Sequence, residues 1–380
     1  MPRLRIRGAL ALLAVAAHAA QLPGPAPGFE PVLAPRALHF PADHGPHPAF
    51  RQEWWYFTGH LAANSGERFG FELTFFRFAL APPGAAPAGP SSWRARELYL
   101  AHFAVSDLGA RRFRYRRKLA RGALGLAGAT GEPLAVWIDD WRLRAAPGEE
   151  GVHWHVSASE PGYALDLELS TDAAPVLQGE AGFSRKGAEP GAASYYYSLP
   201  RLAARGTVRR GGAALAVQGL VWCDREWGSG GLGAGQAGWD WFGLQLSDGS
   251  ALMFYALRTR AGTRAPFSAG SFVAPSGHAQ PLDSAQVRIE SQGRWRSAEG
   301  TVYPSGWHLS VPSLALDLRL TPELTDQELV TTPRYWEGAV AVRGQRGGTS
   351  LGGAGYVELT GYAPERPPGT GSSLGPRLAR

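Results

Sequence analysis

The stretch that decides the fold is EWWYFTGHL, residues 53–61, because a similar stretch, WDWFGLQL, occurs again at residues 239–246. In both places a tryptophan-rich run is followed by a turn that contains glycine and then by a second aromatic run, residues 68–80 and 250–258. Two extended runs joined by a short glycine turn are typical of a β-hairpin. A hairpin pattern that occurs twice predicts an internal duplication, with two β-barrels of similar topology.

Length and composition agree with an all-β protein of two domains. The chain has 380 residues, which is more than one compact core usually supports. Its 50 glycines and 30 prolines are spread along the chain, and this favours many short strands and turns over long helices. We therefore expect two tandem antiparallel β-barrels. A barrel of about eight strands has room inside for side chains or for one small ligand.

Segments rich in glycine and proline mark the domain boundaries. Residues 21–44 contain many prolines and predict an extended lead-in. The first barrel is then expected at residues 45–228 and the second at 229–363, where a glycine-rich tract, GSGGLGAGQAG, forms the junction. Pro, Gly, Ser and Arg dominate residues 364–380, which favours a disordered tail.

The first twenty residues have the pattern of a secretory signal peptide. Three arginines among the first seven residues precede an apolar run at residues 9–17, and the small-x-small triplet AHA follows at 17–19. The apolar run is shorter than the ~20 residues that a membrane-spanning helix needs. We therefore expect an exported protein, periplasmic or secreted.

The net charge of +6 gives little support for a nucleic-acid partner, because half of it belongs to the signal arginines. The one dense basic cluster, residues 111–118, is interleaved with Phe113 and Tyr115. This alternation favours a strand with both aromatic rings facing inward, and contact with an anionic lipid or a nucleic acid is the alternative. We expect no nucleic-acid partner.

Common metal-binding motifs are absent from the sequence. There is no H-E-x-x-H and no C-x-x-C, and Cys223 is the only cysteine, so no internal disulfide can form. His153 and His155 share one face of a predicted strand, but a pair without a third ligand is not typical of a metal site. We expect neither a metal nor a cofactor.

A charged triplet in an aromatic setting is the candidate site. Asp224, Arg225 and Glu226 lie within VWCDREWG, residues 221–228. Buried charges must pair or become neutral. One interpretation is a structural ion pair of Arg225 that joins the two barrels; the other is a carboxyl group with a raised pKa that donates a proton. Both hold if Arg225 keeps Glu226 ionised while Asp224 faces a cavity. The tryptophans expected around the triplet are Trp222, Trp227, Trp239 and Trp241.

Further aromatic residues are candidates for ligand binding. Tyr195 and Tyr197 share one face of a predicted strand and offer two phenol groups to one surface. Trp55 and His60 lie on the first aromatic strand. Because Trp and Tyr need partners for their N–H and O–H groups, their clustering predicts a cavity suited to an elongated apolar ligand.

The chain resembles the carotenoid 1,2-hydratase (CrtC) superfamily, which includes AttH-like exported proteins, in six segments: EWWYFTGHL, YYYSLPRL, VWCDREWG, GWDWFGLQLSDGSALMFYALR, YWEGAV and GYVELTGY. The similarity spans about residues 45–363 and implies two lipocalin-like barrels. In the hydratases, acid catalysis adds water across a C=C bond of a carotenoid without a cofactor. Asp224 matches the aspartate of that family, whereas Trp222, Tyr195 and Tyr197 replace its Tyr, His and Trp.

The sequence thus predicts an exported lipocalin-like protein that binds a long apolar molecule, a polyene or a lipid, in a barrel cavity. Acid-catalysed hydration at Asp224, with Glu226 as a second candidate, is the predicted chemistry. The alternative is a non-enzymatic lipid carrier or an accessory factor of an ABC-type exporter. A hydrolase that activates water with an Asp or Glu stays open as a third possibility.

Overall fold

The chain forms an all-β protein in the computed structural model, which describes residues 26–85, 95–146, 148 and 151–363. Besides strands, this part of the chain contains two single-turn 3-10 helices, η1 (Ala42–His44) and η2 (Pro312–Leu314), and no α-helix. No helix within these ranges could cross a membrane. The expected signal peptide (1–20) and tail (364–380) lie outside the described residues.

Residues 52–228 form one curled antiparallel sheet, the first barrel. Its strand order is β4-β3-β2-β1-β13-β12-β9-β8-β7-β6-β5, and the short strands β10 and β11 pair with β12. The strands are β1 (Gln52–Ala63), β2 (Arg68–Ala79), β3 (Glu97–Asp107), β4 (Arg112–Arg121), β5 (Ala127–Thr130), β6 (Ala135–Ile138), β7 (Trp141–Ala145), β8 (Val152–Glu160), β9 (Tyr163–Thr171), β10 (Val176–Leu177), β11 (Phe183–Arg185), β12 (Ala193–Arg210) and β13 (Ala213–Gly228).

Residues 236–360 form the second barrel. Its main sheet has the order β17-β16-β15-β14-β25-β24-β22-β21-β18, with β23 paired to β24 and a separate pair β19-β20. The strands are β14 (Gln236–Leu246), β15 (Ala251–Thr259), β16 (Ala269–Val273), β17 (Ala279–Asp283), β18 (Arg288–Ser291), β19 (Arg294–Arg296), β20 (Val302–Pro304), β21 (Trp307–Val311), β22 (Leu316–Pro322), β23 (Glu328–Leu329), β24 (Tyr335–Arg346) and β25 (Thr349–Thr360).

The two barrels repeat the same central arrangement of four strands. The first has β2-β1-β13-β12, and the second has β15-β14-β25-β24. In each barrel the leading hairpin turns at a glycine with positive φ, Gly66 (95°) and Gly249 (88°), a conformation that other residues rarely adopt. In each barrel the first strand also pairs with the last, β1 with β13 and β14 with β25, and this pairing joins the two halves of the sheet. The prediction of two lipocalin-like antiparallel barrels is confirmed.

Each barrel is filled by its own hydrophobic core. Trp55, Phe57 and Phe75 belong to the core of the first barrel, and Phe242 and Trp307 belong to that of the second. A third cluster, which includes Tyr56, Trp222 and Trp241, lies where the barrels meet. Since successive side chains of a strand point to opposite faces, β1 and β13 contribute to the first and the third cluster at once.

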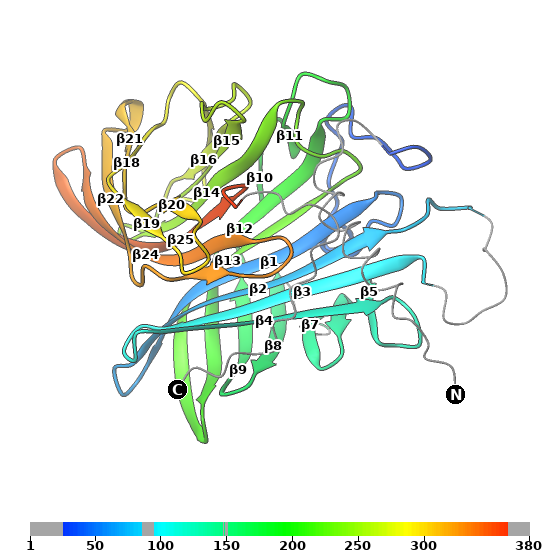
Figure 1. The fold of residues 1–380 in the computed structure, drawn as a ribbon, viewed down its shortest axis with the longest axis horizontal. Helices are drawn as coiled ribbons and strands as arrows, with labels where there is room; N and C mark the ends of the chain where they lie inside the picture. Colours follow the sequence, from blue (N-terminus) through cyan, green and yellow to red (C-terminus); the bar gives the residue numbers. More distant parts are fainter. Residues whose placement is uncertain (1–25, 86–94, 147, 149–150, 364–380) are drawn as a thin grey trace.

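The barrels pack against each other through the outer faces of their central strands. β1 contacts β25, β2 contacts β24 and β12 contacts β14. Figure 1 shows β24 and β25, in orange and red, beside β1 and β13 in the middle of the view. The interface between the barrels is therefore a layer bounded by two sheets, and it buries residues of both.

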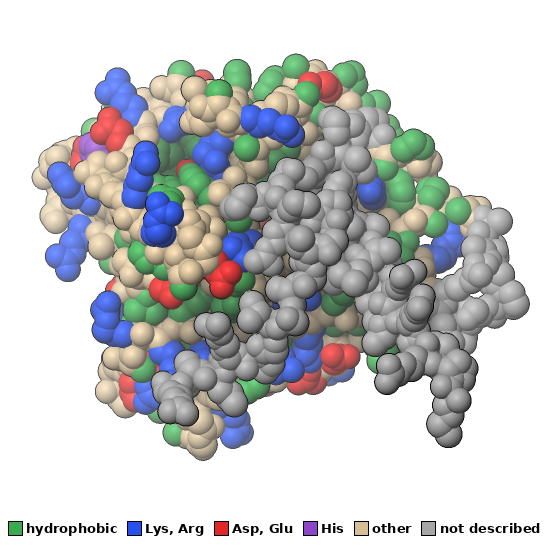
Figure 2. Space-filling view, viewed as in Figure 1, with side chains coloured by type: hydrophobic (Ala, Val, Ile, Leu, Met, Phe, Trp, Pro, Cys, Tyr) green, Lys and Arg blue, Asp and Glu red, His purple; other side chains and the backbone are tan. Residues whose placement is uncertain are grey.

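The basic cluster of residues 111–118 lies on the turn before β4 and on β4 itself. Phe113 and Tyr115 pack against Leu329 and Tyr335, so the aromatic face of β4 meets the second barrel and not the interior of the first. In the part of the visible face that the described residues form, Lys and Arg side chains are spread over both lobes (Figure 2).

Candidate functional site

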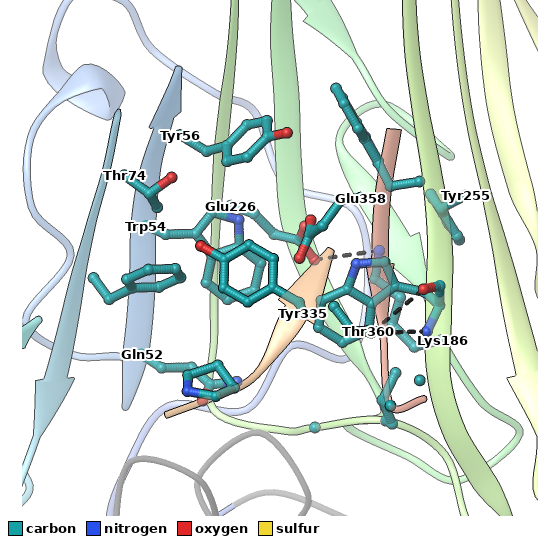
Figure 3. Close-up of a pocket in the computed structure, with 18 of the residues that line it drawn as sticks. Gln52, Trp54, Tyr56, Thr74, Lys186, Glu226, Tyr255, Tyr335, Glu358 and Thr360 are labelled. Atoms are coloured by element: carbon teal, nitrogen blue, oxygen red, sulfur yellow. Dashed lines mark hydrogen bonds and ion pairs between the residues drawn. The ribbon is translucent and has the colours of Figure 1, made fainter. Parts of the chain in front are cut away.

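A cavity of about 630 Å³ lies between the two barrels. Strands β1, β2, β12 and β13 form one wall, and β14, β15 and β25 form the other (Figure 3). The sequence predicted a ligand cavity inside a barrel, whereas this cavity lies between the barrels, and large aromatic and aliphatic side chains form the core of each barrel. The apolar residues that line the cavity include Trp54, Phe76, Phe78, Leu100, Leu232, Trp239, Trp241 and Leu257.

Asp224 lines this cavity and is held by three hydrogen-bond donors. Its Oδ1 accepts from Ser198 Oγ at 2.6 Å and from Trp222 Nε1 at 2.7 Å, and its Oδ2 accepts from the Tyr196 hydroxyl at 2.5 Å. The Trp241 indole donates in turn to the Tyr196 hydroxyl at 3.1 Å. Burial raises the pKa of Asp224 to about 7, against the three donors, which lower it. Asp224 can therefore gain or lose a proton near neutral pH.

Glu226 also lines the cavity but is part of an ion pair. Lys186 Nζ lies 3.2 Å from Glu226 Oε1, and Ser194 Oγ donates to the same oxygen at 2.5 Å. The lysine also donates to Ser184 Oγ at 3.0 Å and lies 4.0 Å from the centre of the Tyr255 ring. Burial opposes the charge of Lys186, yet Glu226 raises its pKa. We interpret the pair as a Lys186 ammonium bound to a Glu226 carboxylate.

Glu358 reaches the cavity from the second barrel. It lies on β25, opposite Trp241 of β14 and Glu337 of β24. Burial raises the pKa of Glu358 to about 8, and a hydrogen bond from Trp239 lowers it only in part. Repulsion from Glu72, Asp224 and Glu226 adds to the effect of burial. Figure 3 shows Glu226 and Glu358 near the middle of the cavity, with Lys186 and Tyr255 to one side.

Two further glutamates, Glu337 and Glu72, do not line the cavity, and each accepts a hydrogen bond from a tyrosine of the other barrel. Tyr56 of β1 donates to Glu337 Oε1 of β24 at 2.9 Å, and Tyr335 of β24 donates to Glu72 Oε1 of β2 at 3.4 Å. The Tyr335 hydroxyl also shares a 2.6 Å hydrogen bond with His102 Nδ1. Burial raises the pKa of Glu72 to about 7 and that of Glu337 well above its usual value. Tyr56 and Tyr335 both line the cavity, so each tyrosine separates one glutamate from it.

Arg225 points away from the cavity into the first barrel. Its Nη2 lies 3.0 Å from Glu53 Oε2, and Arg77 contacts the other oxygen of Glu53. Burial opposes ionisation, but Arg77, His47 and Arg225 hold the pKa of Glu53 well below its usual range. Arg225 thus forms an ion pair, but within one barrel. The expectations that it joins the barrels or holds Glu226 ionised are wrong, because neighbouring strand residues face opposite sides.

Four of the aromatic residues expected to bind a ligand lie in the core of the first barrel. None of them lines the cavity, so the structure does not support a ligand-binding role for them there. The reason is the strand alternation, which turns Tyr196 to the cavity and its two neighbours away from it. The four residues are Tyr195, Tyr197, Trp55 and Trp227.

The other predicted residues lie at or near the cavity. Trp239 and Trp241 line it together with the two carboxyl groups of the triplet. Trp222 does not line it but donates to Asp224, as described above. His60 is hydrogen-bonded to the Gly355 carbonyl oxygen at 2.8 Å between the barrels and does not reach the cavity, which corrects its predicted role.

Sequence reasoning missed four residues of the site: Tyr196, Ser198, Lys186 and Glu358. The first two lie directly opposite Glu226 and Asp224 in the register of β12 and β13, so strand alternation counted from Asp224 could have found them. No local signal points to Lys186 or Glu358, since each reaches the site from a segment distant in the sequence. Among the described residues, no group of three or more His, Cys, Asp or Glu could hold a metal ion.

Solved structures of other proteins share the fold of this chain. A crystal structure of an AttH protein from Nitrosomonas europaea is 36% identical, with a TM-score of 0.77 over 88% of this chain and 100% of that chain. Kievitone hydratase from Nectria haematococca has the same fold, with a TM-score of 0.66, 16% identity, and coverage of 90% of this chain and 98% of that one.

One curated protein that matches by sequence is an enzyme, dehydratase asqC of Emericella nidulans. It is 28% identical over 216 residues, which are 54% of this chain and 60% of that protein, so the match spans less than two thirds of its length. The AttH-like family matches residues 31–362, nearly the whole described chain. The chain therefore belongs to the AttH-like family.

Proposed function

We propose that this protein is a cofactor-independent enzyme of the hydratase type, which adds water to, or removes it from, a C=C bond of an apolar small molecule held between the barrels. The observation that carries the proposal is Asp224, a carboxyl group buried at an aromatic cavity with a pKa near 7. An acid of this kind is protonated in part at neutral pH and can donate to an alkene.

The surroundings of Asp224 fit proton transfer to carbon. Trp54, Trp239 and Trp241 line the cavity, and aromatic faces stabilise the cation that a protonated alkene becomes. Tyr196, Ser198 and Trp222 fix the orientation of the carboxyl group and stabilise the carboxylate that remains after transfer. The dehydratase relative supports this class of reaction, because dehydration makes and breaks the same bonds in reverse.

The ligand that fits best is long and mostly apolar, a polyene or a lipid-like molecule. The lining is rich in tryptophan, phenylalanine and leucine, and its polar side chains are the carboxyl groups, Lys186, Arg334, Gln52 and several hydroxyls. The arginines and apolar run in residues 1–20 support export to the periplasm or beyond as part of the same proposal.

The test uses mass spectrometry in H₂¹⁸O. Purified full-length protein is incubated with a panel of polyenes and of hydroxylated apolar compounds, and the products are examined for gain or loss of one water, with ¹⁸O incorporated on gain. We expect turnover by the wild type and at least a 100-fold loss in Asp224→Asn. Asp172→Asn, the same change at an exposed position, is the control.

A different outcome would favour the alternative function, a non-enzymatic lipid carrier. If a lipid co-purifies unaltered and no compound on the panel changes mass, the hydratase proposal fails and lipid binding without turnover replaces it. If Asp224→Asn turns over substrate as fast as the wild type, Asp224 is not the proton donor.

A further inference from the structure

The cavity receives a carboxyl group from each barrel. Asp224 belongs to β13 of the first barrel and Glu358 to β25 of the second, and both line the same space. Strands β13 and β25 are not hydrogen-bonded to each other, because each belongs to its own sheet. The pair therefore exists only when the two barrels are packed together.

Four carboxyl groups line the cavity, and they differ in how their oxygens are occupied. Glu299 forms an ion pair with Arg334 at 3.6 Å. Asp224 accepts from three donors, and Glu226 is engaged by Lys186 and Ser194. Glu358 is half-buried, accepts from Trp239, and forms no ion pair with any of the described residues. Glu358 thus has the most free capacity to bind a water molecule or a substrate hydroxyl.

The other ionisable groups nearby are less suited to a direct role. Lys186 is bound to Glu226 and Ser184, and Arg334, which also lines the cavity, is paired with Glu299. Glu72 and Glu337 do not line the cavity, since Tyr335 and Tyr56 stand in front of them. This leaves Glu358 as the carboxyl group that shares the cavity with Asp224 and can act on a bound molecule.

We propose that Glu358 is the second acid–base residue of the site and acts as the base when Asp224 acts as the acid. The inference rests on the proposed function. In hydration, Asp224 gives its proton to one carbon of the C=C bond, the oxygen of water bonds to the other carbon, and Glu358 takes a proton from that water. The pair ends with the same number of protons as it began with, now on Glu358. Dehydration runs through the same steps backwards.

Electrostatics supports the sharing of one proton. Two carboxylates that face one apolar cavity repel each other, and Asp224 is among the groups that raise the pKa of Glu358. Such groups titrate as a pair, with apparent pKa values that belong to both. The form that carries one proton then contains one acid and one base, which is what the addition of water requires. The pKa values of about 7 for Asp224 and about 8 for Glu358 are close enough for the two carboxyl groups to share that proton, and hydration starts from the state that has it on Asp224.

The activity test compares Glu358→Gln with the wild type across pH, on the compound that the H₂¹⁸O experiment identifies. We expect kcat to fall at least 100-fold and the decline of the rate toward low pH, where the base becomes protonated, to disappear. Glu290→Gln, the same change at an exposed position on β18, should leave the profile unchanged. Full activity and an unchanged profile in Glu358→Gln would overturn the role of Glu358 while leaving that of Asp224 intact.

A second measurement needs no substrate. Carboxyl groups labelled with ¹³C are titrated by NMR in the wild type, Asp224→Asn and Glu358→Gln. We expect each substitution to lower the apparent pKa of the remaining carboxyl group, because its neighbour no longer carries charge. Trp239→Phe, which keeps both acids, should raise the pKa of Glu358 by removing a donor. Titrations that are independent of each other would overturn the pair, and a wild type that turns over no compound would overturn both the proposed function and the catalytic role of Glu358.

Discussion

The interior of the first barrel and the space between the barrels are built from the same strands, yet they treat charge in opposite ways. Inside the barrel, Glu53 is matched by Arg77 and Arg225, and its pKa is held well below its usual range. Between the barrels, Asp224 and Glu358 have no guanidinium partner in the described chain, and burial raises the pKa of each. Inside the barrel the buried charges are paired, whereas between the barrels two acids with raised pKa values lie beside the Lys186–Glu226 ion pair.

The alternation of β13 separates the two regions within three residues. Asp224 and Glu226 face the cavity, and Arg225 between them faces the core of the first barrel. The comparison teaches that a charged triplet need not be one functional unit. A strand can carry a structural ion pair on one face and acid–base chemistry on the other.

The largest expected effect comes from breaking the buried ion pair inside the first barrel. Glu53→Gln should cost about 3–5 kcal/mol of the free energy of unfolding, since it leaves the buried guanidinium of Arg225 without a carboxylate. Urea denaturation at pH 7 measures this loss. A cost below about 1 kcal/mol would mean that the backbone carbonyls of Trp54 and Gly45, which also accept from Arg225, are sufficient.

The next effect concerns a carboxyl group between the barrels, where a substitution should raise the free energy of unfolding and not lower it. The pKa of Glu72 is raised to about 7 from 4.5, so its neutral form stabilises the fold at low pH and this contribution is lost as pH rises toward 7. Glu72→Gln should therefore be more stable than the wild type at pH 8, by up to about 3 kcal/mol, and equal to it at pH 4. Unfolding curves across pH measure the difference.

The control for this prediction is Glu168→Gln, the same change at an exposed position on β9. It should shift stability by less than about 0.5 kcal/mol at either pH. If Glu72→Gln destabilises the protein equally at pH 4 and pH 8, then Glu72 is ionised in the folded state, and the proposed contrast between the two regions fails at this position.

The smallest effect compares two neighbouring tyrosines. Tyr197→Phe removes a 2.6 Å hydrogen bond to His44 in the first barrel and should cost about 1 kcal/mol without changing Asp224. Tyr196→Phe removes a donor from Asp224 and should raise its pKa above about 7. NMR titration of labelled Asp224 separates the two variants. Equal shifts in both would contradict the assignment of these residues to different faces.

Much of the fold could be predicted from the sequence. The repeated aromatic hairpins at residues 53–80 and 239–258 indicated the two barrels, because strand periodicity and glycine turns are local signals. The candidate site was predicted in part. Asp224 and Trp241 do line the cavity, whereas Tyr195 and Tyr197 lie on the wrong face. Hydrophobic alternation could not reveal this, since both faces of β12 near these tyrosines are buried.

The sequence by itself determined the strand pattern, the duplication and the position of an acid among tryptophans at Asp224. Only the tertiary structure decided that the cavity lies between the barrels, that Arg225 pairs with Glu53, and that Glu358 and Asp224 line the same cavity. The physical reason is that periodicity is a property of neighbouring residues. The packing of one barrel on another depends on which outer faces fit together, and this brings together side chains that no local pattern connects.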